Sequence, residues 1–305
     1  MSYNHHAFGT GIITTAKTGI NWIYNNYINM SYYPEQGPLA FEFYMDYIYC
    51  QPVFERENIS DSILRDLKYD CIDLIEAALR QGKYFICCVD EYYIPEREAY
   101  GRYHFNHNLL IYGVNTTRKE FHTAGYNEYG LFATQKISFK AIKNASINMI
   151  NLLTLRENEP YKLFPHYIQH QILQYNKEYP LDPVGSFSEG GRLVGVDAVD
   201  RMLEDICLMA MDGEPVDVRP VCLLLEQRKL MTDRVRELIQ QGYDIEDVSD
   251  CTDMMLHQVE VLKKRILIYN MRCTDKDVLA LKDIVGSMKG QILPHILRRD
   301  TYDKG

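Results

Sequence analysis

The spacing of apolar residues changes about halfway along the 305-residue chain, and this change limits the fold more than any other feature. Before it, short apolar runs at 84–89 and 109–114 have the length and composition of buried β-strands. After it, apolar residues recur every three or four positions, as between 259 and 269, which is typical of packed helices. We therefore predict an α+β domain over 1–160 and an all-α helical domain over 161–305.

The same patterns predict individual helices and strands. The aromatic segment 41–53 fits either a strand or a helix, and Pro, Gly and Ser indicate a linker at 179–191. The predicted strands span 84–89, 109–114, 120–124 and 131–134. The predicted helices span 7–28, 61–80 and 139–155 in the first domain, and include 231–238, 259–269 and 278–292 in the second.

The charge and composition of the chain exclude some classes of function. Its 33 Lys and Arg against 42 Asp and Glu give a net charge of -9 without a basic cluster, so we expect no nucleic-acid partner. No stretch reaches the roughly 18 apolar residues that a membrane span requires, and no signal peptide is recognised. The eight cysteines form no CxxC pair, which indicates free thiols and a cytoplasmic protein.

His107 is the strongest candidate for a catalytic group. It follows a polar loop and begins the second predicted strand, so rigid backbone would hold its imidazole at the mouth of a sheet. A general base requires that kind of placement. The alternative interpretation is a histidine that only satisfies its hydrogen bonds at a strand edge.

Several residues around His107 are candidates for substrate binding. Asp90 and Glu91 end the first predicted strand, and they either orient an amine substrate or are solvated loop acids. Tyrosines in the loop either line a substrate pocket or cover the sheet edge. Asn108 and Asn127 are placed to hold the imidazole in one tautomer, and each also fits a plain turn or strand edge. The substrate-binding candidates are Asp90, Glu91, Tyr93, Tyr103, His104, Asn108 and Asn127.

Two sequence blocks carry a resemblance to a known family. The block VDEYYIPEREAYGRYHFNHNLLIYGVN covers 89–115 and contains His107, and FHTAGYNEYGLFATQKISFKAI covers 121–142. They resemble the family named for butirosin biosynthesis protein H, and the helical half resembles relatives found beside nonribosomal peptide synthetase genes. The resemblance implies a papain-like first domain that transfers an acyl group from a carrier-protein thioester to an amine.

The resemblance also implies a catalytic triad, which the chain matches directly at one position. His107 fits the histidine that begins a strand. His6 (or His5) stands at the head of the first helix, where the family has a cysteine, and Gly125 stands where an Asp is often found. An enzyme would then either recruit a different thiol, for which Cys50 is the best candidate by position, or use His6 and His107 as base and nucleophile without a thiol. Without a thiolate, the covalent mechanism lacks its usual nucleophile.

We therefore expect an acyltransferase with His107 as general base and no cofactor. It would form an amide or ester from a carrier-bound acyl or peptidyl group in the biosynthesis of peptide-type natural products, with a small molecule or peptide as acceptor. One alternative is a catalytically inactive protein of the same pathway that binds a peptide product or a carrier protein. Another is a structural subunit whose helical half forms a homodimer. In a further interpretation, histidines bind zinc or nickel: His5, His6, His104 and His107.

Overall fold

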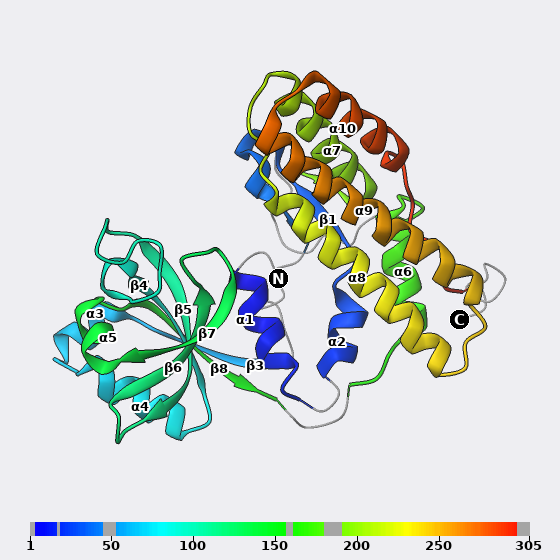
Figure 1. The fold of residues 1–305 in the computed structure, drawn as a ribbon. Helices are drawn as coiled ribbons and strands as arrows, with labels where there is room; N and C mark the ends of the chain where they lie inside the picture. The colour runs from blue at the N-terminus through cyan, green and yellow to red at the C-terminus, as the bar shows by residue number, and fades with distance from the viewer. Residues whose placement is uncertain (1–3, 17–18, 45–52, 157–160, 180–190, 298–305) are drawn as a thin grey trace. The chain divides into compact units, whose positions relative to one another are not determined.

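The computed structural model describes residues 4–16, 19–44, 53–156, 161–179 and 191–297 (Figure 1). Helices make up 51% of the structure and strands 20%. The protein is therefore a mixed α+β chain with a helical C-terminal region, as the sequence predicts.

The chain forms two compact units, and each contains two separate stretches of sequence. Unit 1 consists of Tyr3–Lys17 and Tyr47–Pro160, and unit 2 of Thr18–Asp46 and Tyr161–Gly305. The prediction of one domain over 1–160 is therefore wrong for residues 18–46. They fold with the helical part because strand β1 pairs with β9, which lies far along the sequence.

Unit 1 is built on a six-stranded antiparallel sheet with strand order β3-β8-β4-β5-β6-β7. The four strands from β4 to β7 follow one another in the chain and match the four predicted strands. The bounds are β3 (Phe54–Ile59), β4 (Tyr84–Asp90), β5 (Asn106–Asn115), β6 (Glu120–Tyr126), β7 (Phe132–Ser138) and β8 (Asn148–Leu155).

One face of this sheet packs against helices α4 (Cys71–Arg80) and α5 (Phe139–Asn144). Each helix begins at a side-chain cap: Asp70 accepts from the backbone N–H of Ile72, and Ser138 accepts from that of Ala141. The shared core contains buried apolar side chains from both helices and five strands, among them Ile75, Ala78, Phe85, Cys87, Val89, Leu109, Ile111, Phe121, Ile137, Ile142 and Ile150. We call this side of the sheet the core face.

Helix α1 (Asn4–Ile13) packs on the opposite face. Its Phe8 ring lies 5.9 Å from that of Phe132 on β7. Side chains alternate along a strand, and Phe132 is five residues from Ile137, which belongs to the core face. Figure 1 shows α1 on the side of the sheet away from α4 and α5.

Three predicted helices of the first half are interrupted in the structure. The segment 139–155 forms α5 and then β8, because the run that follows residue 147 pairs with β3 on one side and β4 on the other. The segment 61–80 divides into α3 (Asp61–Asp66) and α4, since Asp70 caps a new helix. The segment 7–28 divides into α1 and α2 (Gly19–Asn26), which belong to different units.

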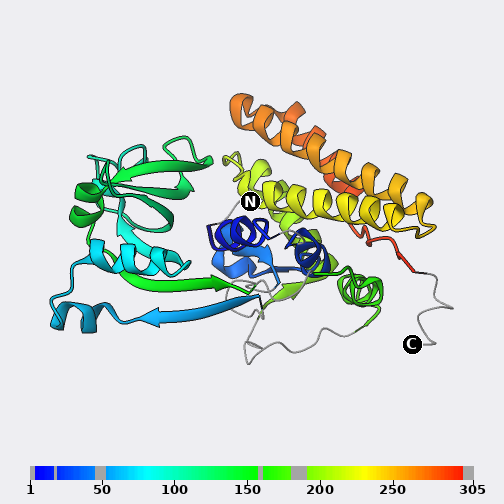
Figure 2. The same ribbon diagram turned by 90° about the horizontal axis from the view of Figure 1, so that it is seen from below.

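Unit 2 combines a small sheet, in the order β2-β1-β9, with long helices. In Figures 1 and 2, α8, α9 and α10 run alongside one another, and α8 and α9 contain the predicted stretches 231–238 and 259–269. The predicted helix 278–292 ends earlier, because α10 stops at Met288. Among the described residues, no helix is long and apolar enough to cross a membrane. The bounds are β1 (Met30–Tyr32), β2 (Phe41–Phe43), α6 (Pro165–Tyr175), β9 (Leu193–Val194), α7 (Gly195–Met211), α8 (Arg219–Gln240), α9 (Glu246–Arg272) and α10 (Asp275–Met288).

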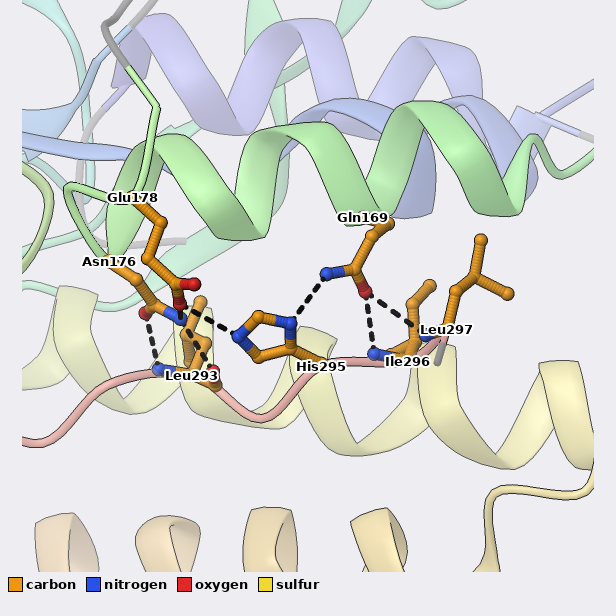
Figure 3. A network of polar contacts seen from close by, with 7 residues as sticks. All are labelled: Gln169, Asn176, Glu178, Leu293, His295, Ile296 and Leu297. Carbon is orange, nitrogen blue, oxygen red and sulfur yellow. Dashed lines mark hydrogen bonds and ion pairs between the residues drawn. The ribbon is translucent and has the colours of Figure 1, made fainter. Parts of the chain in front are cut away.

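The segment after α10 is held along α6 by side-chain amides (Figure 3). Asn176 donates to the carbonyl of Leu293 at 2.8 Å and accepts from its N–H at 2.7 Å. Gln169 accepts from the backbone N–H groups of Ile296 and Leu297. His295 lies between Gln169 at 3.0 Å and Glu178 at 2.7 Å. These amides supply partners that a neighbouring strand would otherwise provide.

Candidate active site

The β4–β5 hairpin brings two acids and two histidines together at one edge of the sheet in unit 1. Strand β4 ends at Asp90, and Glu91 begins the short 3-10 helix Glu91–Tyr93. Strand β5 begins at Asn106, and its His107 lies opposite Val89. The register pairs Asp90 with Asn106, so the end of β4 lies beside the start of β5. By the same register, His107 belongs to the core face of the sheet, with Val89.

His107 is paired with a buried carboxylate. Its Nδ1 lies 3.0 Å from Oε1 of Glu91, whose residue is only 5% exposed, while the imidazole is 33% exposed. A carboxylate only accepts hydrogen bonds, so an imidazole paired with it in this way has its proton on Nδ1 and donates a hydrogen bond to Oε1. The other ring nitrogen, Nε2, then has the lone pair. This is the arrangement in which an imidazole accepts a proton from a reacting group.

Arg97 lies behind this pair, buried in the protein. Its Nε is 3.8 Å from Oε1 of Glu91, and its Nη1 donates to the carbonyl of Tyr126 at the end of β6. Burial lowers the pKa of the Arg97 guanidinium, and the negative charge of Glu91 opposes that shift. The buried acid is therefore accompanied by a buried cation.

The guanidinium of Arg97 also occupies the space above Gly125. A Cβ atom at Gly125 would lie 2.5 Å from Nη2 of Arg97, so a larger residue would displace the guanidinium. The resemblance places an acid at position 125. In the structure, the carboxylate beside His107 comes instead from Glu91, at the end of a different strand.

A second imidazole–carboxylate pair lies next to the first. Nδ1 of His104 is 2.6 Å from Oδ2 of Asp90, and the His104 ring stacks on Tyr92 with centroids 4.5 Å apart. Burial raises the pKa of Asp90, but hydrogen bonds from His104 and from the N–H groups of Tyr92 and Phe105 outweigh it and hold the pKa below its usual range. The His104 side chain is 68% exposed, so this pair lies at the surface.

Aromatic rings continue outward from His107. The Phe105 ring lies 5.3 Å from the imidazole, and the Tyr103 ring lies 6.4 Å from that of Phe105. Both side chains are about half exposed. Tyr93 is partly buried and packs against the core beneath the loop, where it covers the edge of the sheet.

The two predicted asparagines have other surroundings. Oδ1 of Asn127 accepts from the backbone N–H groups of Tyr129 and Leu131, so this side chain closes its own turn. Asn108 lies opposite Cys88 in the register, on the face of the sheet away from the core. In the structure, Glu91 occupies the position beside Nδ1 that either asparagine was predicted to hold.

The candidate nucleophiles are placed as follows. His6 is completely buried on α1, which packs on the face of the sheet opposite to that of His107. Cys50 lies outside the described residues. Cys87 is buried in the core, and burial raises its pKa well above the usual range. Burial also raises the pKa of Cys88, and the charge of Glu91 adds to that shift.

Within the described part of the chain, no three His, Cys, Asp or Glu side chains are grouped so as to hold a metal ion. For His104 and His107, Nδ1 is within hydrogen-bond distance of a carboxylate. The side chain of His5 is not among those described. Each of the two imidazoles that the structure describes at this edge is therefore paired with a carboxylate.

No protein-family model matches this chain, and no curated protein matches it either. The function must therefore be argued from the geometry of the site. Sequence reasoning included Glu91 among the substrate-binding residues but missed its pairing with His107, and it missed Arg97 completely. The only local signal was the spacing of an acid and an arginine in a loop between two strands, which is common in proteins.

Proposed function

We propose that the protein is an acyltransferase of peptide-type natural-product biosynthesis, with a papain-like unit 1 and His107 as its general base. The observation that carries the proposal is the 3.0 Å contact between Nδ1 of His107 and the buried carboxylate of Glu91. The order of a helix followed by an antiparallel sheet with a histidine near the start of a strand supports the papain-like assignment.

In this reaction, an acceptor amine or hydroxyl attacks the carbonyl carbon of a carrier-protein thioester. Nε2 of His107 takes the proton from the acceptor as the new C–N or C–O bond forms. The C–S bond then breaks, and the departing thiolate receives that proton from the imidazolium. Glu91 stabilises the imidazolium through the Nδ1–H bond, as the acid of a catalytic triad does.

Direct transfer to the acceptor fits the site better than a thioester on the enzyme. Raised pKa values keep the thiols of Cys87 and Cys88 protonated at neutral pH, so neither is an effective nucleophile. The helix that would carry the family's nucleophile packs on the opposite face of the sheet from His107. We therefore assign the chemistry to His107 alone, acting on the acceptor.

A second candidate function is binding without catalysis. The exposed rings of Tyr103 and Phe105 beside His107 favour it, because aromatic side chains form good contacts with peptides and acyl chains. Its ligand would be a peptide product or a loaded carrier protein. In that case His107 would only help to position the ligand.

An assay with a simple donor separates the two functions. The protein is mixed with octanoyl-N-acetylcysteamine and benzylamine, and the amide is measured by mass spectrometry against an enzyme-free blank. We expect His107→Ala to slow amide formation about 10²- to 10⁴-fold. His122→Ala is the matched control, because His122 lies on β6 of the same sheet and outside the site.

Two results would contradict acyl transfer. The first is an equal rate for wild type and His107→Ala. The second is no amide above the blank with the wild type, combined with saturable binding of the thioester that Tyr103→Ala and Phe105→Ala weaken. The binding function would then replace the catalytic one.

A further inference from the structure

Glu91 is shared between two basic groups. The same oxygen, Oε1, lies 3.0 Å from Nδ1 of His107 and 3.8 Å from Nε of Arg97. The side chains of Glu91 and Arg97 are only 7% and 1% exposed. A carboxylate removed from water is costly in its charged form unless a cation compensates it. Arg97 is the buried cation on this carboxylate.

The guanidinium of Arg97 makes few hydrogen bonds. Nη1 donates to the carbonyl of Tyr126, whereas Nε and Nη2 are buried and have no hydrogen-bond partner among the described residues. The guanidinium fits against β6 only because residue 125 is a glycine. The carboxylate of Glu91 offsets the buried charge, with a smaller contribution from Glu96, and the cost of burial favours contact between Glu91 and Arg97.

The position of the Glu91 carboxylate determines which nitrogen of His107 can act as a base. A carboxylate accepts from Nδ1–H and leaves the lone pair on Nε2. If the carboxylate moves away, Nδ1–H loses its acceptor, and the imidazole can carry its proton on Nε2 instead. That second tautomer cannot accept a proton from an acceptor at Nε2.

We infer that Arg97 is a positioning residue for His107: it holds the Glu91 carboxylate against Nδ1, and Gly125 provides the space that Arg97 needs. The inference rests on the proposed function only where it calls His107 a base. The tautomer of His107 is a property of the folded protein, and it is measured without any substrate.

Nitrogen-15 NMR of the imidazoles in the full chain tests this inference at a pH where they are neutral. We expect the wild-type proton of His107 to lie on Nδ1. In Arg97→Gln and in Gly125→Ala the proton should lie mainly on Nε2, whereas Arg97→Lys should restore the Nδ1 form. Gly125→Ala retains the charge and displaces it, since the added carbon would lie 2.5 Å from Nη2.

His104 is the matched control in the same molecule, because its Nδ1 is held by Asp90. Its signals should stay unchanged in the Arg97 and Gly125 variants, and Asp90→Asn should alter His104 without altering His107. An unchanged His104 signal also shows that a variant is folded around the hairpin. If Arg97→Gln does not fold, Gly125→Ala decides the question.

An Nδ1 proton on His107 in both folded variants would overturn the inference. Activity provides a separate readout: if the proposed function is correct, Arg97→Gln lowers kcat about tenfold with little change in KM, as expected for a group that acts through another. A change of tautomer in a protein without acyl transfer would reject the proposed function and leave the role of Arg97 intact.

Discussion

At the scale of single residues, Glu91 has opposite effects on the two kinds of candidate catalytic group. Its carboxylate accepts a hydrogen bond from His107, which favours the base. Its negative charge also adds to the effect of burial in raising the pKa of Cys88, which disfavours a thiolate. The carboxylate that supports His107 as a base therefore makes a nearby cysteine a poorer nucleophile.

Cysteine labelling tests this conclusion. With low-dose iodoacetamide near neutral pH, read by peptide mass spectrometry, the exposed Cys273 should label much faster than Cys87 and Cys88. His107→Ala should not change the rate at Cys88, and Glu91→Gln should increase it because a negative charge is removed. Fast labelling of Cys88 that is lost in His107→Ala would instead show a thiol–imidazole pair. The same digest reports whether Cys50 is reactive.

At the scale of elements, α2 depends on side chains from α8. A helix of eight residues is marginal by itself, and its last carbonyls have no partner within the helix. Arg234 is completely buried and donates to the carbonyls of Tyr24 and Tyr27, while Gln227 donates to that of Ile28. A cation at this end also suits the helix dipole.

Removing that cap should destabilise unit 2. Arg234→Met leaves two carbonyls without their donor, and we expect the free energy of unfolding to fall by about 3 kcal/mol. The chain has one tryptophan, Trp22, which lies buried in α2, so its fluorescence during urea unfolding reports the effect directly. Arg236→Met, an exposed neighbour on the same helix, should cost less than about 1 kcal/mol. Equal midpoints for both variants would show that Arg234 is not a cap.

At the scale of the molecule, each unit combines segments that are distant in sequence. Unit 1 takes α1 from the start of the chain and its sheet from later residues. Unit 2 receives its final segment through the amides of Gln169 and Asn176 on and after α6 (Figure 3). Leu293 and Ile296 are buried in that segment, so the amides hold apolar side chains in the core of the unit.

Hydrogen exchange followed by mass spectrometry tests whether these amide contacts hold the segment around Leu293 in unit 2. Asn176→Ala leaves the buried N–H and carbonyl of Leu293 without partners, which costs about 2 to 3 kcal/mol. We expect faster exchange in peptides covering α6 and residues 291–297. Peptides from β4 to β6 belong to unit 1 and should exchange as in the wild type. Unchanged exchange around Leu293 would show that the amide contacts do not hold this segment.

The sequence by itself determined the order of an α+β part and a helical part, the four strands from β4 to β7, and the place of His107 near the start of a strand. These features depend on local patterns: apolar runs, turn residues and helical spacing. Hairpins between neighbouring strands also follow from short loops, so the edge that carries His107 was accessible to sequence reasoning.

Only the tertiary structure decided the features that depend on distant neighbours. The apolar run after residue 147 fits a helix or a strand, and it becomes β8 because β3 and β4 both offer unpaired backbone groups. The segment predicted as one helix over 7–28 divides between two units because each half finds a different core. The link from His107 through Glu91 to Arg97 is likewise absent from any sequence pattern. This link exists because folding buries the carboxylate of Glu91 and the guanidinium of Arg97 in the same place, where each compensates the charge of the other.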